Sequence, residues 1–337
     1  MSSCQYQTAA AYPTISGITY GLLYRSSDYG VTWLSDTNAP TAKWSSVSVS
    51  STGQYQTACI YQGLVYRSSD FGSSWAAIAD LGADDWISVS LSSTGQYQTA
   101  CPQFNYVYVS SDYGKTWTHY TNIPTLAWYF ASLSSTGQYQ TVVSFDGGDT
   151  KIFTSSDYGF NWSYPMVSPL PTACKSVSLS SSGQYQTVTA CDRMYISKDY
   201  GQSWGVANVS APPNACWRTV SVSASGQYQT AAAILTPSPH VTIGRIYTSS
   251  DWGVSWNATT ALTPTGLSSW NSIAMSSNGQ FQTAVSASDD QGGMMIISYD
   301  FGATWSPRNV TLPSIPSSTD SGSILYYGYE TSLLLLP

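Results

Sequence analysis

The sequence predicts an all-β protein, a seven-bladed β-propeller of four-stranded antiparallel blades, and three observations carry this prediction. Two short motifs alternate seven times along the 337 residues. Each unit between successive motifs contains four strand-like segments separated by turns. The end of the chain carries a strand-like segment that the first unit lacks. Repeats of about 40–50 residues with four strands each are typical of propeller blades.

The first motif reads Ser-x-Asp-aromatic-Gly-x-x-Trp and occupies residues 26–33, 68–75, 110–117, 155–162, 197–204, 249–256 and 298–305. Its aspartates are Asp28, Asp70, Asp112, Asp157, Asp199, Asp251 and Asp300. A carboxylate beside glycine in a tight turn accepts hydrogen bonds from nearby backbone N–H groups. We therefore interpret all seven aspartates as structural, and we expect each motif tryptophan to pack between blades.

An aromatic residue follows each of these aspartates, and the turns that carry them share one face of the predicted propeller. We expect the aromatic rings to pack against the adjacent blade. A second interpretation is a rim for self-assembly or for a partner. The residues are Tyr29, Phe71, Tyr113, Tyr158, Tyr200, Trp252 and Phe301.

The second motif reads Gly-Gln-Tyr-Gln-Thr. It starts at Gly53, Gly95, Gly137, Gly183, Gly226 and, with Phe in place of Tyr, at Gly279; a further copy has Cys4 in the glycine position. Strand alternation places its two glutamines on one face and its tyrosine and threonine on the other. Because a buried amide must be hydrogen-bonded, identical copies predict hydrogen-bond ladders between neighbouring blades.

The four strands are clearest in the second unit. Residues 46–50 alternate apolar and polar side chains, and a Ser-Thr-Gly turn follows. We expect further strands over 54–61 and 64–68, and a fourth that begins at Trp75. The whole chain, residues 1–337, is therefore predicted to be a single domain.

The two ends of the chain predict how the ring closes. The first unit lacks its innermost strand, and residues 332–337 read Ser-Leu-Leu-Leu-Leu-Pro. Leu333 and Leu335 fit the two apolar positions that precede the second motif in the other units. We expect this C-terminal strand to pair into the N-terminal blade, which removes an exposed strand edge.

Composition excludes several classes of function. Only 9% of residues are charged, against about 25% on average, and the 11 basic residues argue against nucleic-acid binding. No apolar run reaches the length of a membrane span. The polar, weakly charged composition favours a protein outside the cell or on a virion or other particle surface. No cysteine and histidine spacing predicts a metal centre of that type.

Ser-x-Asp-x-Gly-x-x-Trp resembles the Asp-box, or BNR, repeat of sialidases, sortilin-type receptors, xyloglucanases and photosystem II assembly factors. The Gly-Gln-Tyr-Gln-Thr motif is similar to uncharacterised Asp-box repeats of large DNA viruses and bacteria. The resemblance covers the whole chain and implies a propeller whose Asp boxes are structural. It implies no single function. The sialidase site is not supported, because that family uses three arginines and a Tyr/Glu pair, and the only glutamate here is Glu330.

The candidate ligand site lies on the face opposite the Asp boxes, where the loops vary in length. Five tryptophans precede the innermost strands and are expected at the mouth of the central channel: Trp44, Trp86, Trp128, Trp217 and Trp270. The loops of the same face carry Asp84, Asp85, Asp146, Asp149, Asp289 and Asp290. Aromatic faces with carboxylates between them are typical of sugar-binding surfaces. The alternative is that the tryptophans fill the channel and cover the core.

Three functions remain open at this point. The favoured one is a non-catalytic recognition or scaffold module that binds a glycan or a protein partner through the variable face. The second is a glycoside hydrolase with aspartate acid and base residues on that face, since such chemistry needs two carboxylates. The third is a self-assembling structural subunit. No cofactor is expected; Ca²⁺ at the Asp146–Asp149 loop or at Asp289 and Asp290 is the weaker alternative.

Overall fold

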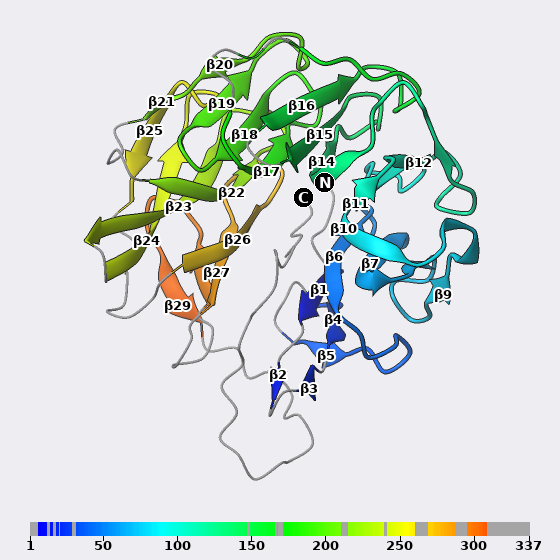
Figure 1. Ribbon diagram of the computed structural model, residues 1–337. Helices are drawn as coiled ribbons and strands as arrows, with labels where there is room; N and C mark the ends of the chain where they lie inside the picture. Colours follow the sequence, from blue (N-terminus) through cyan, green and yellow to red (C-terminus); the bar gives the residue numbers. More distant parts are fainter. Residues whose placement is uncertain are drawn as a thin grey trace.

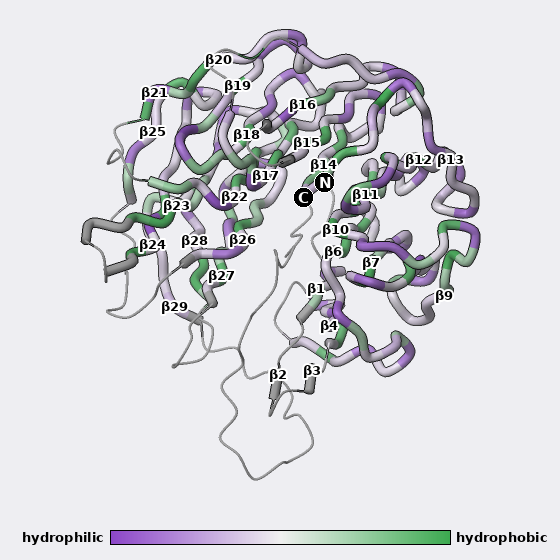
Figure 2. The backbone as a smooth tube through the Cα atoms, viewed as in Figure 1, coloured by the Kyte–Doolittle hydropathy of each residue, from purple (hydrophilic) through white to green (hydrophobic). Residues whose placement is uncertain are grey.

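The computed structural model describes residues 6–11, 14–15, 18–19, 21–28, 32–146, 149–165, 167, 171–209, 215–238, 241–259, 269–287 and 295–308. Over this part of the chain the fold is all-β, with one short 3₁₀ helix, η1 (Ala79–Leu81), and no α-helix. The strands are grouped into successive units, one for each Asp box, which follow one another around a central axis (Figure 1). Figure 2 shows hydrophobic stretches along the strands.

The strands are numbered along the chain. Unit 1 contains β1 (Gln7–Ala11), β4 (Leu22–Ser26) and β5 (Leu34–Ser35), with a small hairpin of β2 (Thr14–Ile15) and β3 (Ile18–Thr19). Unit 2 contains β6 (Trp44–Val49), β7 (Gln56–Gly63), β8 (Val65–Ser68) and β9 (Ala76–Ala77). Unit 3 contains β10 (Asp84–Leu91), β11 (Gln98–Asn105), β12 (Tyr108–Ser110) and β13 (Thr118–His119). Unit 4 contains β14 (Leu126–Leu133), β15 (Gln140–Asp146) and β16 (Asp149–Ser155).

The later units repeat this order. Unit 5 contains β17 (Cys174–Leu179), β18 (Gln186–Ala190), β19 (Met194–Ser197) and β20 (Gly205–Val206). Unit 6 contains β22 (Cys216–Val222), β23 (Gln229–Ser238), β24 (Val241–Ser249) and β25 (Ser255–Ala258). Unit 7 contains β26 (Ser269–Met275), β27 (Gln282–Ala287), β28 (Met295–Ser298) and β29 (Ser306–Arg308). The connecting strand β21 (Asn208–Val209) pairs in parallel with β25.

Consecutive strands within a unit pair antiparallel, as in β6–β7–β8–β9 and β26–β27–β28–β29. The predicted all-β fold of antiparallel sheets is therefore confirmed. The predicted closing strand, with Leu333 and Leu335, lies outside the described residues, so closure of the ring stays a prediction.

The second motif joins each unit to the next through one buried side-chain hydrogen bond. In unit 3 the Thr99 hydroxyl donates to Gln140 Oε1 of unit 4 at 2.6 Å, and Gln140 Nε2 donates to the Gly137 carbonyl at 3.0 Å. The same bond recurs between all successive units: Thr8–Gln56, Thr57–Gln98, Thr99–Gln140, Thr141–Gln186, Thr187–Gln229 and Thr230–Gln282. The predicted hydrogen-bond ladder between units is confirmed.

The ladder uses only the second glutamine of each motif. The strand begins at that residue, as at Gln56 in β7, so strand alternation does not extend back to Gln54. Gln54 instead uses its backbone carbonyl, which accepts the amide of Phe71 at 3.2 Å. Our expectation that both glutamines share one strand face was wrong, because Gln54 and Tyr55 belong to the turn.

The aromatic ring of the second motif's tyrosine packs at a tilt against the Asp-box aromatic of the following unit. Tyr97 and Tyr158 have ring centroids 4.4 Å apart, and Tyr228 and Phe301 are also 4.4 Å apart. The Asp-box aromatics adopt positive φ, for example 67° at Tyr158. This costly backbone conformation is retained because it points the ring at the neighbouring unit. The predicted packing against the adjacent unit is thus found wherever both rings are described.

Each Asp box is a closed hydrogen-bonded turn. In the third copy the Ser110 hydroxyl donates to Asp112 Oδ1 at 2.9 Å and accepts the Gly114 amide at 3.0 Å. Asp112 Oδ1 also accepts the Thr116 amide, and its Oδ2 accepts the Thr116 hydroxyl. Equivalent bonds to the residue four positions later are made by all seven aspartates. The carboxylates are thus engaged in the turns, as expected for a structural role.

These bonds lower the pKa of six Asp-box carboxyls: Asp70, Asp112, Asp157, Asp199, Asp251 and Asp300. In the first five, partial burial alone would raise the pKa, and the hydrogen bonds outweigh it. At Asp300 the bonds from Thr304 are the main cause. A carboxyl whose pKa is lower in the folded than in the unfolded state stabilises the fold above its unfolded pKa of about 4.

We therefore expect the melting temperature to fall steeply as the pH drops below about 4. At that pH these carboxyls bind protons more readily in the unfolded state than in the folded state, so protonation favours unfolding. Thermal unfolding followed by circular dichroism from pH 6 to pH 3 measures this. The variant Asp112→Asn with Asp157→Asn should show a smaller fall. An equal melting temperature at pH 3 and pH 5 would contradict the expectation.

Candidate functional site

The structure places the five tryptophans proposed as a ligand surface inside the core. Trp44, Trp86 and Trp128 are 0% exposed, Trp270 is 1% exposed and Trp217 is 2% exposed. Trp128 packs edge-on against Phe153, with centroids 5.6 Å apart, and its Nε1 donates to the Asn105 carbonyl at 3.0 Å. An indole with no exposed face cannot stack on a sugar ring. The alternative interpretation is right that these side chains belong to the core. It is wrong that they fill the channel, because none of the five lines the axial cavity.

A β-bulge explains why the sequence pattern misled us. In the six inner strands that the structure describes, the pairing register shifts directly after the tryptophan position, for example between Trp86 and Ser88 and between Trp128 and Phe130. A bulge inserts one extra residue and redirects the side chain beside it. The tryptophan is thereby turned away from the axis into the space between neighbouring units, where Trp44 belongs to the same buried hydrophobic cluster as Leu23 and Ala10 of unit 1.

Among the described residues, the aspartates proposed for the ligand site do not form one cluster. Asp84 is half-buried, and its Oδ2 accepts a hydrogen bond from Asn105 Nδ2 at 2.7 Å. Asp85 is half-buried at the start of β10, where it pairs with Tyr61. Asp146 and Asp149 face each other across the end of the β15–β16 hairpin in the backbone register.

Asp289 and Asp290 lie outside the described residues. Within the described part of the chain, no three His, Cys, Asp or Glu side chains are placed to hold a metal ion. A Ca²⁺ site at either aspartate pair therefore stays a prediction. No helix among the described residues is long and apolar enough to cross a membrane.

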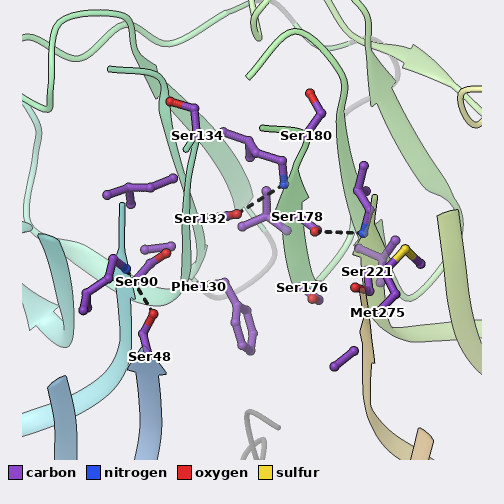
Figure 3. A pocket seen from close by; sticks show the side chains of 18 of the residues that line it. Ser48, Ser90, Phe130, Ser132, Ser134, Ser176, Ser178, Ser180, Ser221 and Met275 are labelled. Atoms are coloured by element: carbon purple, nitrogen blue, oxygen red, sulfur yellow. Dashed lines mark hydrogen bonds between the residues drawn. The ribbon is translucent and has the colours of Figure 1, made fainter. Parts of the chain in front are cut away.

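The inner strands of units 2 to 7 surround an axial cavity of about 260 Å³ (Figure 3). Its described lining carries no charged residue and consists mainly of serines and small aliphatic side chains. The serines that point into it include Ser48, Ser90, Ser132, Ser178 and Ser221. The Ser-x-Ser alternation of the inner strands marks these cavity serines in the sequence. In the sequence analysis it indicated strands and not a cavity.

The cavity serines also satisfy the backbone of the neighbouring unit. The Leu179 amide donates to Ser132 Oγ at 3.2 Å, and the Val222 amide donates to Ser178 Oγ at 3.1 Å (Figure 3). Inner strands have one open edge, and these hydroxyls serve as its acceptors. A hydroxyl that accepts an N–H still has its own proton to donate, so the cavity wall can offer hydrogen bonds to a guest.

At one end of the cavity, a chain of backbone hydrogen bonds runs around the axis. The Ser93 amide donates to the Ser135 carbonyl at 2.9 Å, and the Ser135 amide donates to the Ser181 carbonyl at 2.9 Å. The same bond joins Ser51 to Ser93, Ser181 to Ala224 and Ala224 to Ser277. The opposite end, with Phe130, Ser176 and Thr219 in the lining, lies toward the variable loops.

Three of the described cysteines lie in units 5 and 6. Cys174 stands where five other units carry tryptophan, and it is buried, whereas Cys191 and Cys216 are half-buried. Burial raises the pKa of Cys174 above its usual range. Cys59 and Cys101 are fully buried, as expected for core thiols, and burial raises the pKa of Cys59 to about 12.

Comparison with known proteins identifies the repeat. The family model of the BNR-Asp box repeat matches residues 107–120, which span the third Asp box. The chain carries the Asp-box repeat. The other six copies share its hydrogen-bond pattern from aspartate to the residue four positions later. A comparison of the sequence with curated proteins finds no significant match.

Solved β-propellers are similar in fold. The GH74 enzyme of Niastella koreensis aligns with a TM-score of 0.54 and 14% identity, over 91% of this chain and 64% of that enzyme. YCF48 bound to D1 peptide aligns with a TM-score of 0.58 and 12% identity, over 88% of this chain and 86% of that one. The β-propeller domain of Cps50 (Swd1) from Myceliophteria thermophila aligns with a TM-score of 0.56 and 13% identity, over 77% of this chain and 84% of that one. These likenesses show the fold; the chain spans less than two thirds of the GH74 enzyme.

Proposed function

We propose that this protein is a non-catalytic recognition propeller that binds an uncharged segment of a protein partner in its axial cavity, entered from the variable face. The observation that carries the proposal is the lining of that cavity, which offers hydroxyls and aliphatic surface without a charged group among the described residues. Such a lining suits peptide groups, which need hydrogen-bond partners, more than an ion. Support also comes from a propeller of similar length, YCF48, whose structure holds a bound peptide.

The proposal assumes seven units in a closed ring. Six ladder bonds join successive units from unit 1 to unit 7, and the pattern predicts a seventh from unit 7 back to unit 1. If Leu333 and Leu335 form the closing strand, Leu333→Asp with Leu335→Asp should lower the melting temperature far more than Ser317→Asp with Ser318→Asp. Equal effects in thermal unfolding would argue against closure by this segment.

The binding proposal is tested with a random peptide library and an oligosaccharide array on the purified protein. Ser221→Arg and Ser90→Arg each place a long cation in the cavity from different units, whereas Gln202→Arg adds the same charge on an exposed Asp-box turn. We expect selected peptides to lose at least about tenfold in affinity in the two cavity variants, about 1.4 kcal/mol, and to keep it in the control.

Three outcomes would count against the proposal: no peptide is selected, the cavity variants bind as well as the control, or only sugars bind. Sugar release by the wild type would instead support the hydrolase alternative. Thermal unfolding of each variant shows whether a loss of affinity reflects loss of fold. A location outside the cell or on a particle surface is part of the proposal, because the weakly charged composition favours it.

A further inference from the structure

Two cationic residues stand at equivalent positions of neighbouring inner strands. Lys175 lies near the start of β17 in unit 5, and Arg218 lies near the start of β22 in unit 6. Each is the residue at which the pairing register of its strand shifts, and β17 and β22 are in contact. The Val222 amide of β22 donates to Ser178 Oγ of β17 at 3.1 Å. The two bulges therefore lie at the same level of adjacent strands.

This bulge position faces the mouth of the axial cavity. In unit 7 the equivalent residue, Asn271, itself lines the cavity. The residues that directly follow the two cations, Ser176 and Thr219, line the end of the cavity that lies toward the variable loops. Lys175 and Arg218 are half-buried. Because long cationic side chains keep their charged ends in water, the two charges are expected at the rim of this entrance.

The fold does not require a cation at the bulge. The equivalent residue is Ser45 in unit 2, Ile87 in unit 3 and Tyr129 in unit 4. The whole chain has only 11 basic residues and a net charge of -7, yet two of the basic residues occupy this position in adjacent units. Like charges on neighbouring strands repel each other. Their placement together is therefore better explained by an anion that binds between them than by stability.

We propose that Lys175 and Arg218 form an anion subsite at the mouth of the axial cavity, which binds the carboxylate of an aspartate or glutamate in the peptide that the cavity holds. The inference rests on the proposed function and defines the class of partner: a neutral segment beside an acidic residue. A guanidinium donates two parallel N–H bonds to a carboxylate, and an ammonium adds a further donor and a second charge. Asp192, which follows the neighbouring strand β18, is already paired with Arg193 at 2.6 Å.

A carboxylate suits this subsite better than a phosphate does. Phosphate sites commonly add backbone N–H groups from a helix N-terminus or a turn. The described part of the chain has no α-helix, and the inner-strand amides of Leu179 and Val222 already donate to serine hydroxyls. Two side-chain cations without such amides match a singly charged group.

The test compares peptides that differ only in charge. We expect the peptides selected on the wild-type protein to share an aspartate or glutamate beside a neutral segment. One such peptide is made with glutamate and with glutamine at that position, and its affinity is measured by isothermal titration calorimetry. The glutamate peptide should lose at least about tenfold in affinity for Lys175→Gln with Arg218→Gln. The glutamine peptide should bind this variant and the wild type equally.

Lys115→Gln with Lys198→Gln is the matched control, since it removes the same two charges from exposed Asp-box turns. We expect this control variant to bind the glutamate peptide as the wild type does. Glutamine keeps most of the length and the polarity of the replaced side chains, so thermal unfolding should be unchanged in both double variants. Should Lys175→Gln with Arg218→Gln fail to fold, the comparison of the two peptides on the wild type still decides the question.

The inference is overturned if the selected peptides share no acidic residue, if the glutamine peptide binds the wild type as tightly as the glutamate peptide, or if the control variant loses as much affinity. A phosphoserine peptide that binds more tightly than the glutamate peptide would overturn the assignment to a carboxylate. Failure of the proposed function looks different. If no peptide is selected, both proposals fail; if only the arginine substitutions inside the cavity are without effect, the cavity proposal fails and the anion subsite stands.

Discussion

Replacing Trp128 by alanine is expected to lower the free energy of unfolding by about 3–5 kcal/mol. The indole is fully buried, packs on Phe153 and donates to the Asn105 carbonyl, so the substitution leaves a cavity and a buried acceptor without its donor. Urea denaturation followed by tryptophan fluorescence or circular dichroism measures the change. The effect follows from the position of the side chain between two units rather than from a ligand.

Trp252 is the matched control for this experiment. It is the same residue type, but it is 39% exposed on an Asp-box turn and packs at a tilt against Tyr185 with centroids 6.2 Å apart. We expect Trp252→Ala to cost about 1 kcal/mol. If Trp128→Ala were as mild as Trp252→Ala, the assignment of the five tryptophans to the core would be wrong.

Replacing Gln140 by leucine is expected to cost about 2–5 kcal/mol, the second large effect. The leucine keeps the approximate size of the side chain but removes the acceptor for the Thr99 hydroxyl and the donor to the Gly137 carbonyl. Gln140 is 0% exposed, so both groups would be left buried without that partner. Because the bond joins units 3 and 4, the loss weakens the contact between units.

A double-mutant cycle with Thr99→Val isolates the bond between the units. We expect the two substitutions to be non-additive by about 1 kcal/mol or more, because each removes the same hydrogen bond. Gln138→Leu, at the half-buried first glutamine of the same motif, is the control and should change stability by about 0.5 kcal/mol or less. Additive single effects would show that the Thr99–Gln140 bond does not couple the units.

The repeats predicted most of the fold because each motif residue has one local task. Asp112 closes its turn, Gln140 joins two units, and Tyr97 stacks on Tyr158. Seven copies in sequence made these tasks visible as identity without any knowledge of the structure. The predicted alternation of side chains between the two strand faces was wrong where the backbone departs from a regular strand, as at Gln54.

The candidate site was predicted less well, for the same physical reason. The bulge after Trp86 and Trp128 reverses the side chain from the axis to the core, and nothing in a period-two pattern signals it. The cavity is lined by serines such as Ser90 and Ser221, which alternation places on one face but which carry no distinctive chemistry.

Protection of a cavity thiol by a bound peptide tests the central claim most directly. Ser221→Cys places a thiol in the axial cavity, and Gln202→Cys places one on an exposed turn. The rate of maleimide labelling at each position is measured by mass spectrometry with and without a saturating peptide from the library selection. We predict that the peptide slows labelling at position 221 by at least about tenfold and leaves position 202 unchanged. Equal labelling rates at position 221 with and without bound peptide would contradict the claim that the axial cavity is the binding site.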